Sequence, residues 1–254
     1  MKTEWNSTQY LKFKNQRTQP AMDLVSRLAG MNPKTVIDLG CGPGNSTVLL
    51  AEAFPKANII GIDSSEDMIK KAKSSYPDIQ FEKKDVYEIL KNYDLIFTNA
   101  CLQWIPNHEK LIPFLMNHLT EGGTFASQFP MNEAEPLYRI IKEVTSNPKW
   151  MFDYEKLDYN GQLTIEEYYN ILYACSSEFQ IWETKYCHDL ESHRALIEWV
   201  KGTKIRPFLA QLNDDNKILF ETELENNAKC AYPTMQNGHV LFGFNRFFII
   251  AKKS

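Results

Sequence analysis

The sequence predicts an α/β fold in which a doubly wound, mostly parallel seven-stranded sheet carries helices on both faces and a helical cap. Between residues 35 and 129, short β-branched or aromatic runs alternate with helical patterns, and several of these runs are apolar on both faces. Two further strand patterns follow after residue 178. Strands that alternate with helices in short units form parallel sheets covered on both sides.

The first half of the chain contains five predicted strands separated by helices. The strands are expected at residues 35–39, 58–63, 79–84, 93–100 and 124–129. The helices are expected near residues 45–54, 66–75 and 107–119. This part is an open doubly wound unit.

The second half is richer in helices. A helix is expected at residues 133–145, and Thr164 with Glu167 is typical of a capping box that opens a helix through Cys175. Strands are predicted at 179–186 and 240–251, and helices at 192–201 and 213–228. One domain spans 1–254: a core of about 30–130, 166–188 and 238–252, a cap of about 131–165 and 190–232, and an N-terminal lid at 1–29.

Composition narrows the class of protein. The chain has 254 residues with a net charge of -4, and no block of basic residues typical of a nucleic-acid binder. No long apolar run predicts a membrane span, and the start has no signal-peptide pattern, so we expect a cytoplasmic protein. Its five cysteines are scattered and odd in number, which favours free thiols over disulfides or a zinc site.

A glycine-rich turn follows the first predicted strand. Gly40, Gly42 and Gly44 lie between an apolar strand and a helix. Glycines at such positions let the backbone approach a ligand closely, and the helix behind presents unpaired N–H groups. The turn indicates a nucleoside-bearing ligand, although dinucleotide sites and ordinary tight turns share the pattern.

An aspartate ends the second predicted strand. Asp63 stands 19 residues after Gly44, where a carboxylate can accept hydrogen bonds from both ribose hydroxyls of a nucleoside. The alternative is that Asp63 caps the next helix, a task that Ser64 and Ser65 can also perform. The glycines follow the spacing GxGxG, with Asp38 before them, rather than the GxGxxG of nicotinamide sites.

These motifs together resemble class I S-adenosylmethionine-dependent methyltransferases. The resemblance rests on DLGCGPGNS, on GIDSS followed by Met68, and on Asp85 after the third strand. Further features resemble the trans-aconitate 2-methyltransferase family: Trp5-Asn6 with Tyr10, Phe13, Arg17 and Pro20, the stretch DLIFTNACLQW, Ser192-His193 with Trp199, Arg206 and Pro207, and the closing FNRFFIIAK.

The resemblance implies a cofactor site for S-adenosylmethionine. The glycines would hold the methionine moiety, Asp63 the ribose, and Asp85 with the Val86 backbone the adenine amino edge. Asn99 and its neighbours would line the methyl end, although Trp104 also suits a plain core position. The full set of expected cofactor-binding residues is Tyr10, Arg17, Gly40, Gly42, Gly44, Asp63, Ser64, Met68, Asp85, Val86, Asn99, Ala100, Gln103 and Trp104.

The family esterifies a carboxylate of a small tricarboxylic acid. Because a carboxylate nucleophile is ionised at neutral pH, we nominate no catalytic acid or base. The histidines form no ligand-like cluster, so we expect no metal. Arg206 is the first choice for binding a substrate carboxylate, although an ordinary surface arginine is equally consistent with the sequence. The other expected substrate-binding residues are Trp199, Tyr186, His193, Arg246 and Gln128.

The chain departs from the family pattern in two places. After Gln128 it reads FPMNEA, where close relatives carry an acidic residue and a tryptophan, and Cys187 stands where a second tyrosine would follow Tyr186. Both departures fall in the expected cap, so they put the identity of the acid in doubt while leaving trans-aconitate as the first choice.

Three other functions fit parts of the sequence. A malonyl-acyl-carrier-protein O-methyltransferase shares the glycine turn and a Gln-Trp pair, but its basic docking surface has only modest candidates here. Another small-molecule methyltransferase also fits, whereas a nucleic-acid methyltransferase is disfavoured because no Asn-Pro-Pro-Tyr follows the fourth strand. A non-enzymatic S-adenosylmethionine-binding regulator would keep the same cofactor residues.

Overall fold

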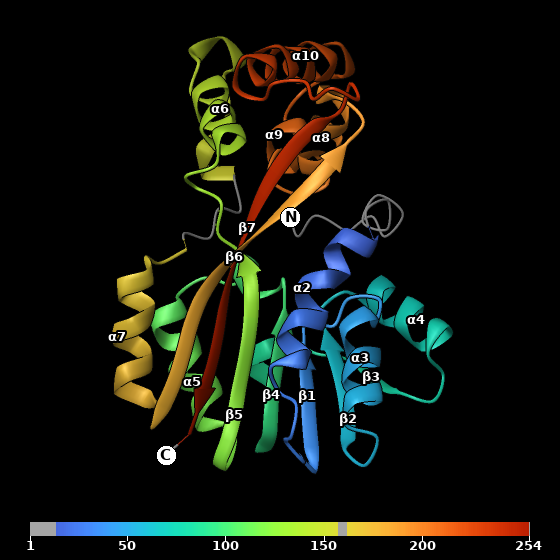
Figure 1. Cartoon of the computed structure of the whole chain (residues 1–254), viewed down its shortest axis with the longest axis vertical. Coiled ribbons are helices and arrows are strands. Elements are labelled where there is room, and N and C mark those ends of the chain that lie inside the picture. The colour runs from blue at the N-terminus through green and yellow to red at the C-terminus, as the bar shows by residue number, and fades with distance from the viewer. Residues whose placement is uncertain (1–13, 157–161, 254) are drawn as a thin grey trace. The chain divides into compact units, whose positions relative to one another are not determined.

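The seven strands form one mixed sheet in the order β3-β2-β1-β4-β5-β7-β6 (Figure 1). The computed structural model describes residues 14–156 and 162–253. The strands are β1 (Thr35–Leu39), β2 (Asn58–Asp63), β3 (Gln80–Lys83), β4 (Tyr93–Asn99), β5 (Leu119–Pro130), β6 (Glu178–Leu190) and β7 (Val240–Lys252). The pairs among β1 to β5 are parallel, and β7 runs antiparallel to β5. The predicted doubly wound α/β fold is confirmed.

The helices are α2 (Lys14–Ser26), α3 (Asn45–Ala53), α4 (Glu66–Ser75), α5 (His108–Asn117), α6 (Pro136–Thr145), α7 (Ile165–Cys175), α8 (His193–Lys201), α9 (Arg206–Leu209) and α10 (Asp214–Ala231). Helices α3 to α8 and α10 lie close to their predicted positions, whereas α2 and α9 were not predicted as helices. Short 3-10 turns occur at η1 (Val86–Glu88), η2 (Leu102–Trp104), η3 (Pro148–Trp150) and η4 (Tyr154–Lys156). The predicted capping box of Thr164 and Glu167 is present at the start of α7.

Several boundaries differ from the prediction, among them the end of β6 at Leu190, and two of the differences have identifiable reasons. Strand β5 begins at Leu119 rather than at residue 124, because an irregularity in its pairing with β4 accommodates Gly122 and Gly123. Helix α6 begins at Pro136, three residues late. Proline is favoured in the first turn of a helix and disfavours helical geometry in the residue before it, so Glu135 is the N-cap.

Chain contacts divide the protein into two compact units. Unit 1 contains Met1–Pro130, Asn160–Thr184 and Arg246–Ser254, and unit 2 contains Met131–Tyr159 and Lys185–Asn245. Strands β6 and β7 contribute residues to both units. Within unit 1, α2 packs on α3 and β5, while α5 packs on β5 and α7; Figure 1 shows α2 and α3 in front of the sheet and α5 behind it. Within unit 2, α10 packs on α6 and α8.

The middle of the sheet is the core of unit 1. Leu95, Ile96 and Phe97 of β4 are each 0% exposed, and Val36 and Leu39 of β1 are equally buried. Since β1 to β5 are parallel, their carboxyl ends lie along one edge of the sheet. We call this edge the carboxyl edge; it is where open α/β sheets bind ligands.

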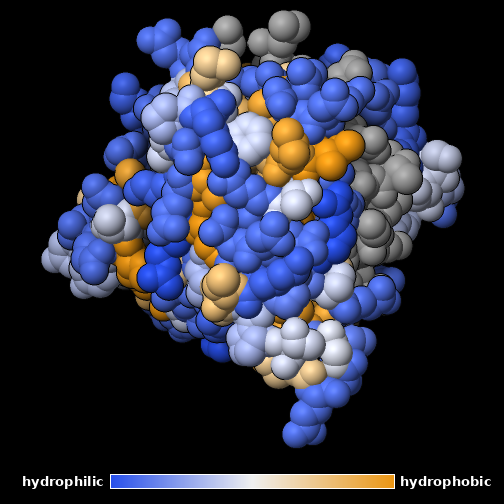
Figure 2. Space-filling view, turned by 90° about the horizontal axis from the view of Figure 1, so that it is seen from above, coloured by the Kyte–Doolittle hydropathy of each residue, from blue (hydrophilic) through white to orange (hydrophobic). Residues whose placement is uncertain are grey.

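The surface visible in Figure 2 is mostly hydrophilic, with hydrophobic residues in small separate areas. This agrees with a mean hydropathy of -0.40. Among the helices of the described residues, none combines the length and apolar character that a bilayer crossing needs.

Candidate functional site

The glycine turn between β1 and α3 has left-handed backbone at each glycine. The φ values are 65° at Gly40, 54° at Gly42 and 92° at Gly44. A Cβ at Gly40 would lie 2.2 Å from the Cys101 Sγ, and one at Gly44 would lie 2.8 Å from the Tyr76 ring. At Gly42, by contrast, a Cβ would meet no atom within 4 Å. The outer two glycines are therefore required by packing, whereas Gly42 faces open space.

Asp63, at the end of β2, holds this turn in place. Its Oδ2 accepts from the Gly42 N–H at 3.0 Å, and its Oδ1 accepts from the Ser65 N–H at 2.8 Å. Partial burial raises the pKa of this carboxyl. Each carboxylate oxygen has two lone pairs, so Asp63 can still accept from a ligand hydroxyl. Ser65 is the N-cap of α4, and Met68 in its first turn is buried.

Asp85 lies beside Asp63 on the carboxyl edge. The Lys84 N–H donates to the Asp63 carbonyl at 3.1 Å, which fixes the chain next to β2. Asp85 is the N-cap of η1 and accepts from the Tyr87 N–H at 3.1 Å, while Glu88 completes a capping box. Val86 is the first residue of η1, so an acceptor and a neighbouring backbone N–H follow β3 together.

The ends of β4 and β5 are joined through side-chain amides. Asn99 and Gln128 are opposite each other in the sheet, and the Gln128 Nε2 donates to the Asn99 Oδ1. Ala100 has a φ of 53°, which is unusual for a residue with a Cβ, and its N–H donates to the Gln128 carbonyl at 2.8 Å. The Gln103 Nε2 donates to the Ala100 carbonyl at 2.8 Å, and Trp104 follows in η2. The structure thus brings these predicted residues together.

Sequence reasoning gave Asp38 no role, yet it is the most deeply buried acid of the site. It is 0% exposed in β1, and its Oδ2 accepts from the Ser46 Oγ and the Thr47 Oγ1, each at 2.7 Å. Within the described residues, the Asp38 Oδ1 has no hydrogen-bond donor. Burial raises the pKa of Asp38 to about 7. The signal in the sequence was a charged residue inside an otherwise apolar strand.

The residues predicted to bind substrate belong to different units. Gln128 and Arg246 are buried in unit 1, where Arg246 lies opposite Pro130. Tyr186, His193, Trp199 and Arg206 belong to unit 2. Tyr10 and the side chain of Arg17, both predicted to contact the cofactor, lie outside the described part of the chain.

The unit 2 candidates have distinct surroundings. Trp199 is 2% exposed and stacks on His188 with ring centroids 4.5 Å apart, so its ring belongs to the core of that unit. The His193 Nε2 lies 2.8 Å from the Tyr232 carbonyl, to which it donates. Arg206 is half-buried at the start of α9. Substrate contacts from these side chains stay a prediction.

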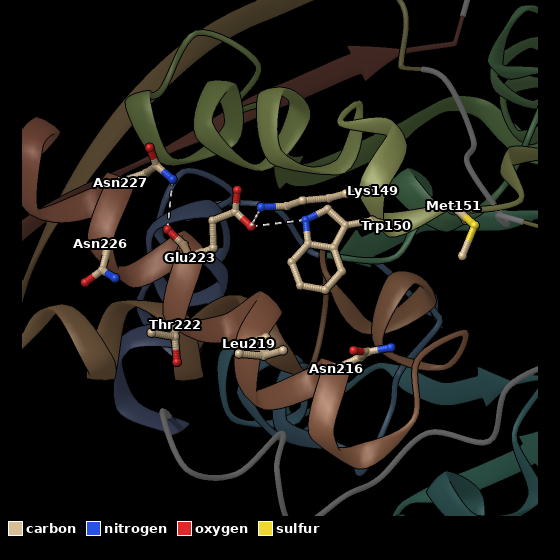
Figure 3. Close-up of a pocket in the computed structure, with 9 residues that line it drawn as sticks. All are labelled: Lys149, Trp150, Met151, Asn216, Leu219, Thr222, Glu223, Asn226 and Asn227. Carbon is tan, nitrogen blue, oxygen red and sulfur yellow. Dashed lines mark hydrogen bonds and ion pairs between the residues drawn. The ribbon is translucent and has the colours of Figure 1, made fainter.

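Unit 2 also contains a pocket of about 580 Å³ between η3 and α10 (Figure 3). Three of its polar side chains pair with one another: Glu223 accepts from the Trp150 Nε1 at 3.2 Å and pairs with the Lys149 Nζ at 2.7 Å. None of the predicted site residues lines this pocket. The candidate site is therefore the set of residues at the carboxyl edge of unit 1.

Comparison with known proteins places this geometry in a class. The methyltransferase domain family matches residues 32–176. The YcgJ protein of Bacillus subtilis has a similar fold, with a TM-score of 0.61 and 14% identity over 92% of this chain and 98% of its own. The Haemonchus contortus phosphoethanolamine N-methyltransferase 2, solved with S-adenosyl-L-methionine, has a TM-score of 0.54 and 16% identity over 93% of this chain and 53% of its own. Fold and site thus define a class I methyltransferase.

The particular family follows from the full-length relatives. A trans-aconitate 2-methyltransferase of Escherichia coli O157:H7 is 40% identical over 254 residues, which is 99% of each chain. The chain belongs to the trans-aconitate 2-methyltransferase family.

The buried Asp38 predicts a pH dependence of stability. Because burial raises its pKa from 3.8 to about 7, the folded chain holds the proton more tightly than the unfolded chain does. The contribution of Asp38 to the free energy of unfolding is therefore complete below pH 3.8 and is lost as the pH rises towards 7. Between about pH 4.5 and 7.5, the free energy of unfolding should therefore fall less in Asp38→Asn than in the native chain, by up to roughly 3 kcal/mol. Urea unfolding at the two pH values measures this difference.

Asp94 provides the matched control. Burial opposes its ionisation, but hydrogen bonds from Thr120, Lys34 and Thr35 lower its pKa below 3.8. Its contribution is lost only as the pH falls through that range, so Asp94→Asn should lower stability by the same amount at both test pH values. An unchanged slope in Asp38→Asn would contradict the assignment.

Proposed function

We propose that this chain is an S-adenosylmethionine-dependent O-methyltransferase that esterifies a carboxylate of trans-aconitate. One observation carries the proposal: 40% identity to trans-aconitate 2-methyltransferases over 99% of both chains. The carboxyl edge supports it, because acceptors and amides stand where a nucleoside-bearing ligand binds in this fold. A cytoplasmic location is part of the same proposal.

The residues at the edge fit the proposed cofactor. S-adenosylmethionine supplies an electrophilic methyl group on a cationic sulfur. Its ribose hydroxyls and adenine amino group are donors, and they would bind Asp63 and Asp85. The Asp38 Oδ1 is a buried acceptor that lacks a donor among the described residues, which suits a cationic or N–H group of the ligand. Open space at Gly42 leaves room for the ligand against the turn.

The proposed reaction requires the protein to orient the reactants and does not require it to transfer a proton. A carboxylate with a pKa of roughly 4 is already ionised at neutral pH, so no general base is needed. Holding the nucleophile in line with the methyl group and excluding water supply the acceleration. Asn99, Ala100 and Gln103 would line this end of the site, with Trp104 and Gln128 beside them.

Substrate selection depends on the remaining carboxylates of the acid. We assign Arg206 to one of them, with Arg246, Tyr186, His193 and Trp199 as further candidates, because guanidinium groups bind carboxylates in a bidentate manner. The sequence after Gln128 and the change at Cys187 differ from close relatives, and these positions decide between trans-aconitate and other acids.

A transfer assay tests the proposal directly. The full chain is incubated with methyl-labelled S-adenosylmethionine and, in parallel, with trans-aconitate, other small polycarboxylic acids, a malonyl-carrier protein and nucleic acid. We expect base-labile label in trans-aconitate. Label in the carrier protein alone would support the malonyl ester instead, and cofactor binding without any transfer would support a regulator.

Replacing Arg206 tests the substrate assignment. Arg206→Ala should raise the KM for trans-aconitate about tenfold to a hundredfold while changing the KM for the cofactor little, since a charge-assisted hydrogen bond is worth about 1.5–3 kcal/mol. The control is Arg139→Ala, because Arg139 is an exposed arginine of the same unit. Equal increases in both KM values would indicate a general folding defect and remove the assignment.

Two glycines with similar backbone conformation and similarly open surroundings test the cofactor assignment. Gly42 and Gly122 both have positive φ, 54° and 69°, and a Cβ at either would meet nothing within 4 Å. Gly42→Ala and Gly122→Ala should each cost about 1–2 kcal/mol of stability, measured by urea unfolding. Only Gly42→Ala should weaken S-adenosylmethionine binding in equilibrium dialysis, by about tenfold or more. Equal affinities in the two variants would show that the cofactor does not lie on this turn.

A further inference from the structure

A buried histidine and tyrosine lie beneath the turn that follows β4. His108 is the first residue of α5 and is 2% exposed, and Tyr168 of α7 is 0% exposed. The His108 Nδ1 lies 2.6 Å from the Tyr168 Oη, and its Nε2 lies 2.9 Å from the Leu102 carbonyl oxygen. The imidazole thus connects α7 to the first residue of η2.

The partners determine the direction of each hydrogen bond. A carbonyl oxygen can only accept, so the His108 Nε2 carries a hydrogen, and in a neutral imidazole the Nδ1 is then an acceptor. Tyr168 must then donate its hydroxyl hydrogen, and burial raises the pKa of this phenol, which keeps it protonated. A chain of hydrogen bonds therefore runs from the Tyr168 hydroxyl through the His108 ring to the Leu102 carbonyl.

The same two rings pack under the end of β5. Phe129, which follows Gln128, has its ring centroid 6.1 Å from His108 and 5.5 Å from Tyr168. The ring centroid of Phe247 in β7 lies 5.2 Å from that of Tyr168, so four aromatic rings pack together here. Rotation of either polar ring would disturb β5 beside the Gln128 amide.

The turn itself needs an external support. It begins at Ala100 and ends at Asn107, and both have left-handed backbone, with φ values of 53° and 59°. Asparagine adopts this conformation fairly readily, but alanine does so only when its surroundings impose it. The Leu102 carbonyl also accepts from the Ile105 N–H at 2.8 Å. This oxygen therefore accepts one hydrogen bond that closes the η2 turn and another from His108.

We propose that His108 and Tyr168 are positioning residues that hold η2, and through it Gln103 and Trp104, in the geometry that methyl transfer requires. The inference rests on the proposed function, because that function assigns Gln103 and Trp104 to the methyl end of the site. Both rings are buried, so we assign neither of them a contact with the reactants. Their effect is on orientation, to which transfer reactions are sensitive at distances of about 1 Å.

Tyr168→Phe tests the inference with little change in shape. We expect kcat to fall about tenfold or more while the KM and the dialysis Kd for S-adenosylmethionine change less than about threefold, because Asp63 and Asp85 are not involved. Tyr173→Phe is the matched control, since Tyr173 lies on the same helix and is 73% exposed. A fall in Tm without a fall in kcat would reduce the pair to a structural role and overturn the inference.

Two His108 variants and a hydrogen-exchange measurement distinguish a positioning role from a general folding defect. His108→Gln keeps an N–H for the Leu102 carbonyl and should retain more kcat than His108→Ala; equal losses would overturn the inference. Hydrogen exchange followed by mass spectrometry should show faster exchange of the Trp104 and Ile105 amides in Tyr168→Phe than in the native chain.

The exchange measurement also separates failure of this inference from failure of the proposed function. If the native chain methylates no acid, the proposed function fails, and the inference is judged on exchange alone. Unchanged amide exchange at η2 in Tyr168→Phe then overturns the inference. Faster exchange at η2 in Tyr168→Phe, with native exchange rates in Tyr173→Phe, supports the conclusion that His108 and Tyr168 stabilise this turn.

Discussion

An aspartate buried in β1, inside the sheet, constrains the carboxyl edge around the glycine turn. Burying an ionised group is costly unless its oxygens are hydrogen-bonded. One oxygen of Asp38 meets this requirement through Ser46 and Thr47, and these bonds fasten the first turn of α3 to β1. The chain between them must reverse within a few residues, which is why the glycines there have left-handed backbone. The other oxygen lacks a protein donor in the described chain, so either a proton or a ligand group stabilises it.

The acids along the edge combine a structural role with a proposed binding role. Asp63 accepts from Gly42 and Ser65, so it aligns the glycine turn with the start of α4 before any ligand is present. Asp85 likewise accepts from the backbone of the turn that it caps. Preorganised acceptors lose little conformational freedom when a ligand binds, which lowers the cost of association. The fold and the proposed cofactor site are therefore specified by the same hydrogen bonds.

Local sequence patterns were sufficient to predict most elements of the fold, because hydrophobic periodicity and caps are set by near neighbours. The capping box of Thr164 and Glu167 is one such local signal. Contacts between distant residues were not predictable in this way. His108 and Tyr168 are 60 positions apart, and Asn99 and Gln128 meet only because parallel strands align their ends. Asp38 was seen as part of the motif but given no role, because its hydrogen bonds to Ser46 and Thr47 form only when the glycine turn brings α3 back against β1.

The distribution of charge along the edge suits the proposed reaction. Transfer of a methyl group breaks its bond to a cationic sulfur as a bond to a carboxylate oxygen forms, and it leaves a neutral thioether and a neutral ester group. The charges on the reacting groups are therefore reduced on the way to the transition state. Surroundings that stabilise separated charges would favour the reactants over that transition state. Asp38 lies within β1, Asp63 ends β2 and Asp85 follows β3, whereas the residues at β4 and β5 assigned to the methyl end are neutral. At that end, amides such as Asn99 and Gln128 bond to each other, and orientation rather than ionic attraction is left to set the rate.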